Sequence, residues 1–255
     1  GTLGGADSVT SEGLAEVAAD GTSEGLGDAD AHVADAMPEQ RETVIPSGRC
    51  DQTMALPLAS DAALVSLDTP KGVVFHGDRL WVSDSAAGQI VKFTDSGVFV
   101  QRWTGFDGFE GSFHPSALAV TDERVFVTDA EAGHLISATT SGVLVGVWGD
   151  TGADALVEPR GLSVQGDEVW VADTAAGVLR VFGATTGSLL RQVGGGVLQR
   201  PVALAFDGDE VVVADEGRAQ IVTLTESGVE VFATDYEGQL VQPSGVAFAG
   251  GTLFV

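Results

Sequence analysis

Asparagine is absent from this sequence of 255 residues, and cysteine and lysine are nearly absent, with one and two copies. Because Cys50 stands alone, it cannot form an intrachain disulfide, and the Cys-x-x-Cys spacing of many metal and haem sites does not occur. No stretch approaches the ~18 consecutive apolar residues of a transmembrane helix. We therefore expect no membrane insertion.

Basic side chains are also scarce: 12 lysines and arginines face 37 aspartates and glutamates, for a formal net charge of −25. Nucleic-acid affinity comes mainly from basic side chains that neutralise phosphates, so we expect no nucleic-acid partner. The motifs of serine hydrolases, phosphate loops and dinucleotide sites cannot be placed, and the four histidines lack partners at metal-ligand spacing. The sequence thus predicts no catalytic residue, no metal and no cofactor.

Residues 1–50 are poor in large apolar side chains and rich in alanine, glycine, acidic and hydroxyl residues. Such a composition buries too little apolar surface to offset chain entropy, which predicts a mostly disordered, low-complexity acidic linker. Short transient helices at 12–19 and 29–37 are the alternative. Two alternatives also stay open for location: a bacterial-type export signal that has been removed, leading outside the cell or to the periplasm, or no such signal.

A repeat dominates the remainder, 51–255. Its copies align on prolines spaced by 45, 44, 42 and 42 residues, namely Pro70, Pro115, Pro159, Pro201 and Pro243. This period is typical of one four-stranded blade of a β-propeller. No copy holds an apolar stripe at helical spacing; short β-branched or aromatic runs alternate with glycine and aspartate turns instead. We therefore predict an all-β fold.

Each copy predicts four strands, a to d. In the first copy these are GVVF (72–75), LWV (80–82), QIVKF (89–93) and VFVQRW (98–103). The second residue after each proline is glycine or alanine, which we interpret as the crowding of strand a at the centre of the propeller. The apolar triple of strand b indicates a strand covered on both faces. The copies predict four complete blades at about 70–114, 115–158, 159–200 and 201–242, and part of a fifth at 243–255.

The order of proline, small residue, apolar strand, Val-[Ser/Ala/Thr]-Asp, Ile/Leu-centred strand and glycine turn resembles the NHL repeat from Thr69 to Val255. The Asn-x-Arg-Ile usual after the aspartate is replaced, as by Ala-Gly-Gln-Ile at 87–90. That family forms β-propellers, commonly six-bladed and TolB-like. The resemblance implies an incomplete six-bladed propeller.

The last residues, GTLFV, stop inside strand b of the fifth copy. A domain that ends there leaves apolar edges and unpaired backbone, so we expect a fragment of a longer gene product. In the alternative, Met54–Leu58 and Ala63–Leu67 supply strands c and d of the last blade.

Function is expected on the loop face, the end of the blades that holds the d–a loops (104–114, 149–158, 194–200 and 235–242) and the b–c turns. Loops of varying length on a repeated frame are a usual place for recognition. The residue before each proline changes type between copies, as a ligand-reading position or an unconstrained exposed position would. The candidate ligand-binding residues are His114, Glu158, Arg200 and Gln242.

An aspartate recurs 14 residues after each of the first four prolines, at Asp84, Asp129, Asp173 and Asp215. We expect each side chain to accept backbone N–H groups in its own b–c turn. A shared metal is the weaker interpretation, because side chains on separate blades do not converge on one point.

Two functions follow. The first is a non-enzymatic binding or scaffold module that recognises a protein or a small-molecule ligand through the loop face. The alternative is a propeller hydrolase or lyase, lactonase-like or amidating-lyase-like, whose metal ligands lie in missing blades. Resemblance to the lactonases implies a metal held by Glu, Asp and two Asn, and this chain has no Asn. The amidating lyases imply histidines on several inner strands, which are also absent from these copies.

Overall fold

The computed structural model of the protein consists of β-strands with very little helix. It describes residues 66–225, 228–234, 242–249 and 251–255. Within these residues lie four antiparallel four-stranded sheets, one two-stranded hairpin and two single-turn 3-10 helices, η2 (Gly152–Asp154) and η3 (Glu216–Arg218). None of the helices in this described part is long and apolar enough to cross a membrane.

The strands follow the repeat. The first blade contains β1 (Pro70–His76), β2 (Arg79–Asp84), β3 (Gln89–Thr94) and β4 (Phe99–Trp103). The second contains β5 (Pro115–Val120), β6 (Arg124–Asp129), β7 (His134–Thr139) and β8 (Leu144–Trp148). The third contains β9 (Pro159–Gln165), β10 (Glu168–Asp173), β11 (Val178–Gly183) and β12 (Leu189–Val193). The fourth contains β13 (Pro201–Asp207), β14 (Glu210–Asp215), β15 (Gln220–Thr225) and β16 (Gly228–Thr234). The hairpin pairs β17 (Ala247–Ala249) with β18 (Thr252–Phe254).

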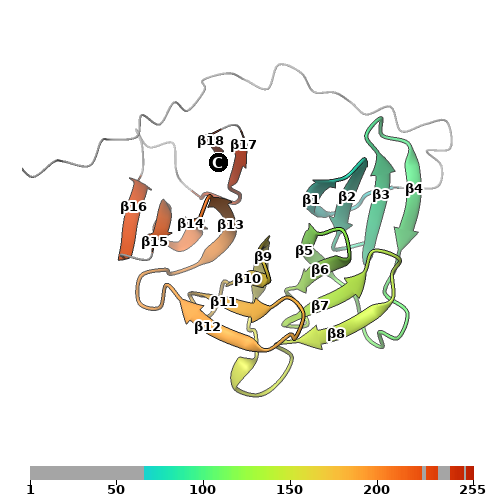
Figure 1. Ribbon diagram of the computed structural model, residues 1–255, viewed down its shortest axis with the longest axis horizontal. Coiled ribbons are helices and arrows are strands. Elements are labelled where there is room, and N and C mark those ends of the chain that lie inside the picture. Colours follow the sequence, from blue (N-terminus) through green and yellow to red (C-terminus); the bar gives the residue numbers. More distant parts are fainter. Residues whose placement is uncertain (1–65, 226–227, 235–241, 250) are drawn as a thin grey trace, which may run out of the picture. The chain divides into compact units, whose positions relative to one another are not determined.

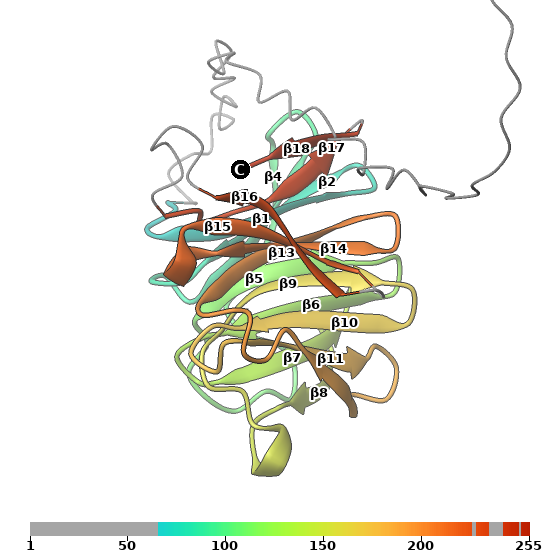
Figure 2. The same ribbon diagram turned by 90° about the vertical axis from the view of Figure 1, so that its left-hand side faces the viewer.

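The four sheets are arranged as the blades of a propeller. In each sheet the strands are paired in chain order, so that the first strand lies at one edge and the fourth at the other. The first strands contact one another in sequence, β1 with β5, β5 with β9, β9 with β13 and β13 with β17 (Figure 1). Viewed from the side, the sheets lie face against face (Figure 2).

The core lies between neighbouring blades. Successive side chains of a strand point to opposite faces, so one strand serves two interfaces. In β6, Val125 and Val127 pack with Trp81 of the first blade, whereas Phe126 packs with Val169 of the third. Burying each such side chain contributes about 1.5–3 kcal/mol to the free energy of folding. The apolar triples predicted for strand b therefore hold neighbouring blades together.

The small residues near the start of each first strand let the inner strands approach closely. A Cβ atom added to Gly161 would lie 2.6 Å from the carbonyl oxygen of Val202 and 2.7 Å from the Cα of Ala203. At Gly72 the same atom would lie 3.0 Å from the carbonyl oxygen of Ser116. The crowding that the sequence predicts at these positions is therefore present.

Hydroxyl groups link three successive pairs of blades. Two come from the end of a second strand and the third from the residue directly after one, and each donates a hydrogen bond to a backbone carbonyl in the first strand of the next blade. The bonds are Ser83 to Ser116 (2.5 Å), Thr128 to Arg160 (2.6 Å) and Thr174 to Pro201 (2.6 Å). We call these bonds the blade links.

The predicted fold, four complete blades and the start of a fifth in an all-β propeller, is confirmed. In the fifth copy the first strand starts at Ala247, two residues later than expected. The predicted linker at 1–50 and the segment Met54–Leu58 lie outside the described residues. Most of Ala63–Leu67 does too, and its described residues Ser66 and Leu67 are not in a strand. A total of six blades stays a prediction.

Candidate functional site

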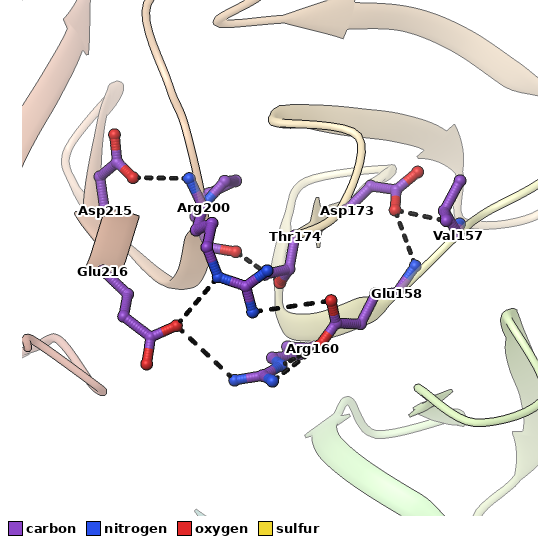
Figure 3. Close-up of polar contacts among 9 residues, drawn as sticks. Val157, Glu158, Arg160, Asp173, Thr174, Arg200, Asp215 and Glu216 are labelled. Carbon is purple, nitrogen blue, oxygen red and sulfur yellow. Dashed lines mark hydrogen bonds and ion pairs between the residues drawn. The ribbon is translucent and has the colours of Figure 1, made fainter. Parts of the chain in front are cut away.

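A buried aspartate connects the d–a loop to the sheet in each complete blade. All four are fully buried at the end of a second strand: Asp84, Asp129, Asp173 and Asp215. Asp173 Oδ1 accepts hydrogen bonds from the N–H groups of Val157 and Glu158, both at 3.0 Å (Figure 3). Asp215 Oδ1 likewise accepts one from the N–H of Arg200, at 2.7 Å. These bonds fix the backbone directly before the proline.

The aspartates also receive other hydrogen bonds. Asp129 accepts from the N–H groups of Glu131 and Ala132 in its own turn, at 3.1 and 2.9 Å. Bonds from the loop before the proline, which the sequence did not indicate, occur in all four blades. A side-chain donor reaches three of the carboxylates: Gln89 to Asp84 (3.0 Å), Arg180 to Asp173 (3.0 Å) and Gln220 to Asp215 (3.4 Å).

Asp84 keeps its charge in spite of its burial. Burial acts to raise the pKa of this carboxyl, but hydrogen bonds from the Gln89 amide and from the N–H groups of Asp68, Thr69 and Ala87 outweigh it. The net effect lowers the pKa below its ordinary value. An ionised carboxylate is the better acceptor for several N–H groups at once.

Four charged side chains meet on the loop face where β9 and β13, the first strands of the third and fourth blades, begin. We call Glu158, Arg160, Arg200 and Glu216 the charge quartet (Figure 3). Glu158 and Arg160 flank Pro159, Arg200 precedes Pro201, and Glu216 follows the buried Asp215. The aspartate bonds described above hold the backbone of Glu158 and Arg200 in place.

Opposite charges alternate around the quartet, and each side chain contacts two partners of the other sign. The nitrogen–oxygen distances are 2.7 Å for Arg160–Glu158, 4.0 Å for Arg160–Glu216, 3.3 Å for Arg200–Glu216 and 3.7 Å for Arg200–Glu158. The quartet is therefore a closed ring with no net charge.

The quartet is accessible to a ligand. The arginine side chains are 39% and 40% exposed, and both glutamates are 27% exposed. Ion pairs at such exposure contribute only about 0–1 kcal/mol each, so their partners are exchanged at low cost. The Nη1 of Arg160 is 4.0 Å from Glu216, which is longer than a hydrogen bond, and so remains a donor for an incoming group.

The structure brings two of the four candidate ligand-binding residues together, Glu158 and Arg200. His114 pairs instead with Glu131, with Nδ1 3.5 Å from the carboxylate. Gln242 is exposed, and within the described part of the chain it forms no hydrogen bond or ion pair with the other three. The sequence analysis missed Arg160 and Glu216, although each directly follows a repeat landmark, Pro159 and Asp215. Within 66–225 and the later described segments, no three histidine, cysteine or acidic side chains are grouped as a metal site requires.

No protein family model matches the sequence, and no curated protein matches it. Solved structures are similar in fold. A catalytically inactive virginiamycin B lyase from Staphylococcus aureus, crystallised with quinupristin, has 19% identity and a TM-score of 0.59, covering 72% of this chain and 61% of the lyase. A streptogramin B lyase has 17% identity and a TM-score of 0.58, covering 72% of this chain and 60% of its own. The chain thus spans about three fifths of these lyases, and the likeness shows a shared propeller fold.

Proposed function

We propose that this chain is a non-enzymatic, NHL-type propeller module that binds a ligand on its loop face through the charge quartet. The observation that carries the proposal is the closed ring of alternating charges, which is part-exposed and stands on backbone fixed by Asp173 and Asp215. The ligand is a protein segment or a small molecule that carries both a carboxylate and an ammonium or guanidinium group.

The mixed charge of the ligand follows from electrostatics. A guanidinium binds a carboxylate through two parallel N–H bonds, which suits Arg160 and Arg200. A purely anionic ligand meets the repulsion of a chain with a net charge of −25. A purely cationic ligand that binds Glu158 and Glu216 breaks their ion pairs with the arginines, and both guanidiniums are then left without a counter-charge. A ligand with both signs replaces each contact that it breaks.

The test is a titration followed by NMR of the arginine Nε–H signals. A dipeptide of one glutamate and one lysine is the probe, and dipeptides of two glutamates or two lysines are the comparison. We expect saturable shifts at Arg160 and Arg200 with the mixed dipeptide and smaller shifts with the other two. Arg191, which pairs with Glu168 away from the quartet, is the internal control and should not move.

Glu158→Gln should weaken binding of the mixed dipeptide by about tenfold, the usual effect of losing one charge-assisted hydrogen bond. Its matched control is Glu123→Gln, which changes the same charge outside the quartet. Equal shifts with all three dipeptides, or equal affinities of the two variants, would overturn the proposal.

A lyase or hydrolase activity is the second candidate, favoured by the shared fold with the virginiamycin B and streptogramin B lyases. In this case the charge quartet belongs to the substrate site of a longer protein. Incubation of that longer protein with quinupristin, followed by chromatography, separates the two functions. Conversion of quinupristin supports the lyase, whereas dipeptide binding without conversion supports the binding module.

A further inference from the structure

At one position of the loop face, the second blade differs from the first and the fourth blades. In the first and fourth blades, the residue paired across from the buried aspartate is Gln89 or Gln220, and its amide donates to that carboxylate. In the second blade the residue paired with Asp129 is His134. The His134 Nε2 is buried and has no hydrogen-bond partner. A buried polar atom without a partner costs about 1–3 kcal/mol, so this one needs an explanation.

His134 lines a cavity of about 350 Å³, between the 104–114 loop and the strands β7 and β8. Its ring lies edge-on to Phe109, with centroids 5.8 Å apart. Phe109, Leu144 and Val147 form an apolar wall of the cavity. Glu110 and Asp150 add carboxylates at its exposed rim. A cavity of this size with an apolar wall and a few polar groups is typical of small-ligand sites.

The charges of the cavity select the ligand. None of the residues that line it is a lysine or an arginine, so an anion finds no positively charged partner there. The carboxylates of Glu110 and Asp150 accept hydrogen bonds, and an aromatic face such as that of Phe109 attracts a cation. We propose that this cavity, the histidine pocket, binds a small organic ammonium compound whose apolar body packs on Phe109, Leu144 and Val147.

The protonation state of His134 fits this ligand. Burial lowers the pKa of the imidazole, against the opposing effect of the Asp129 and Asp150 carboxylates. The ring is therefore neutral at pH 7, and a neutral imidazole has one nitrogen that accepts a hydrogen bond. A neutral ring beside the cavity does not repel an ammonium group.

Isothermal titration calorimetry with 2-phenylethylammonium tests the proposal. The comparison ligands are 3-phenylpropionate and 2-phenylethanol, which have the same ring with a negative or no charge. We expect saturable binding of the ammonium compound and at least about tenfold weaker binding of the other two, because each lacks the charge-assisted hydrogen bond. The proposal would be wrong if the ammonium compound showed no saturable binding, or if 3-phenylpropionate bound with equal affinity.

Two variants place the binding in the histidine pocket. Asp150→Asn should lower affinity for 2-phenylethylammonium about tenfold, whereas Asp154→Asn, in the same loop but outside the cavity lining, should not. His134→Gln should weaken binding and also raise the melting temperature, because glutamine restores the bond to the aspartate that the first and fourth blades have. Glu158→Gln in the charge quartet should leave this binding unchanged, so the two proposals fail separately. Unchanged affinity in Asp150→Asn would show that the ligand binds elsewhere.

Discussion

Each carboxylate that ends a second strand fixes loop backbone about 15 residues before it, as Asp84 does for Thr69. The side chain is fully buried and its acceptor positions face the N–H groups of the loop and the Gln89 amide. Replacing one oxygen by an NH₂ group would set a donor against these donors. Replacing one carboxylate oxygen at this residue is therefore enough to break the hydrogen bonds that hold the loop before the proline.

Asp84→Asn should lower the free energy of unfolding at pH 7 by about 3 kcal/mol, measured by urea denaturation. Because the folded-state pKa of Asp84 is lowered, its contribution is fully present above the unfolded pKa of about 4 and is lost as pH falls through the folded value. The difference in free energy of unfolding between the unchanged protein and Asp84→Asn should therefore become smaller below about pH 4. Asp78→Asn, on an exposed side chain of the same blade, is the control and should change stability by less than about 0.5 kcal/mol. A stability difference that does not vary with pH would contradict this account.

Gly161→Ala tests the close approach of β9 and β13. The new methyl group meets backbone atoms of Val202 and Ala203 at 2.6–2.7 Å, and backbone cannot rotate aside. We expect a loss of about 1–3 kcal/mol in the free energy of unfolding. Gly195→Ala is the matched control, since its methyl group meets only Val178, at 3.8 Å. Equal stability of the two variants would mean that the inner strands move apart freely.

Two of the four residues of the charge quartet could be predicted from single positions of the sequence. Glu158 and Arg200 stand at positions that vary between repeats, whereas their contacts with Arg160 and Glu216 depend on how closely two blades approach. No local sequence pattern encodes that distance. The unusual His134 could also have been found from the sequence, because an alignment of the repeats puts it at the position that Gln89 and Gln220 occupy in other copies.

At the scale of strands, the blade links join the second strand of one blade to the first strand of the next. Thr128 is fully buried; its hydroxyl donates to the carbonyl of Arg160 and accepts from the N–H of Ala117 at 3.0 Å. Alanine occupies the corresponding position in the third and fourth blades, at Ala172 and Ala214, and the third blade forms its link from Thr174, the residue after the aspartate.

Thr128→Val keeps the shape of the side chain but removes the hydroxyl that pairs with the Arg160 carbonyl and the Ala117 N–H, both part-buried. We expect a loss of about 1–3 kcal/mol in the free energy of unfolding, measured by urea denaturation. Thr128→Ser keeps the hydroxyl and should lose less than about 1 kcal/mol. A larger loss of stability in Thr128→Ser than in Thr128→Val would show that packing of the methyl group, and not the blade link, stabilises the contact between the blades.

The strands themselves were predictable, because each apolar run lies between glycine or aspartate turns. LWV at 80–82, for example, lies inside β2. The blade links were not predictable, since serine and threonine at the end of a strand indicate nothing about a carbonyl in the next blade.

Across the whole molecule, each blade contacts its neighbours in chain order, as repeat proteins do. Val73 and Phe75 of the first blade are 65% and 60% exposed. At the position of Val73, the second and third blades have Leu118 and Leu162, which are buried. Among the described residues, therefore, the first blade is covered by a neighbour on one flank and the second blade on both.

Amide hydrogen exchange, followed by mass spectrometry, should be faster in β1–β4 than in β5–β8, because a sheet with one covered flank opens at a lower free-energy cost. The third blade should resemble the second. Equal protection of the first and second blades would show that the sheets open together as one cooperative unit.

The blade links have a consequence for how such a gene changes over generations. The second and third repeats each carry both halves of the joint, a hydroxyl on one side and a receiving carbonyl on the other. Unequal recombination that duplicates or deletes one such repeat therefore brings matching halves together at the new boundary. The number of blades is free to grow or shrink in one genetic step, with no compensating mutation at the seam.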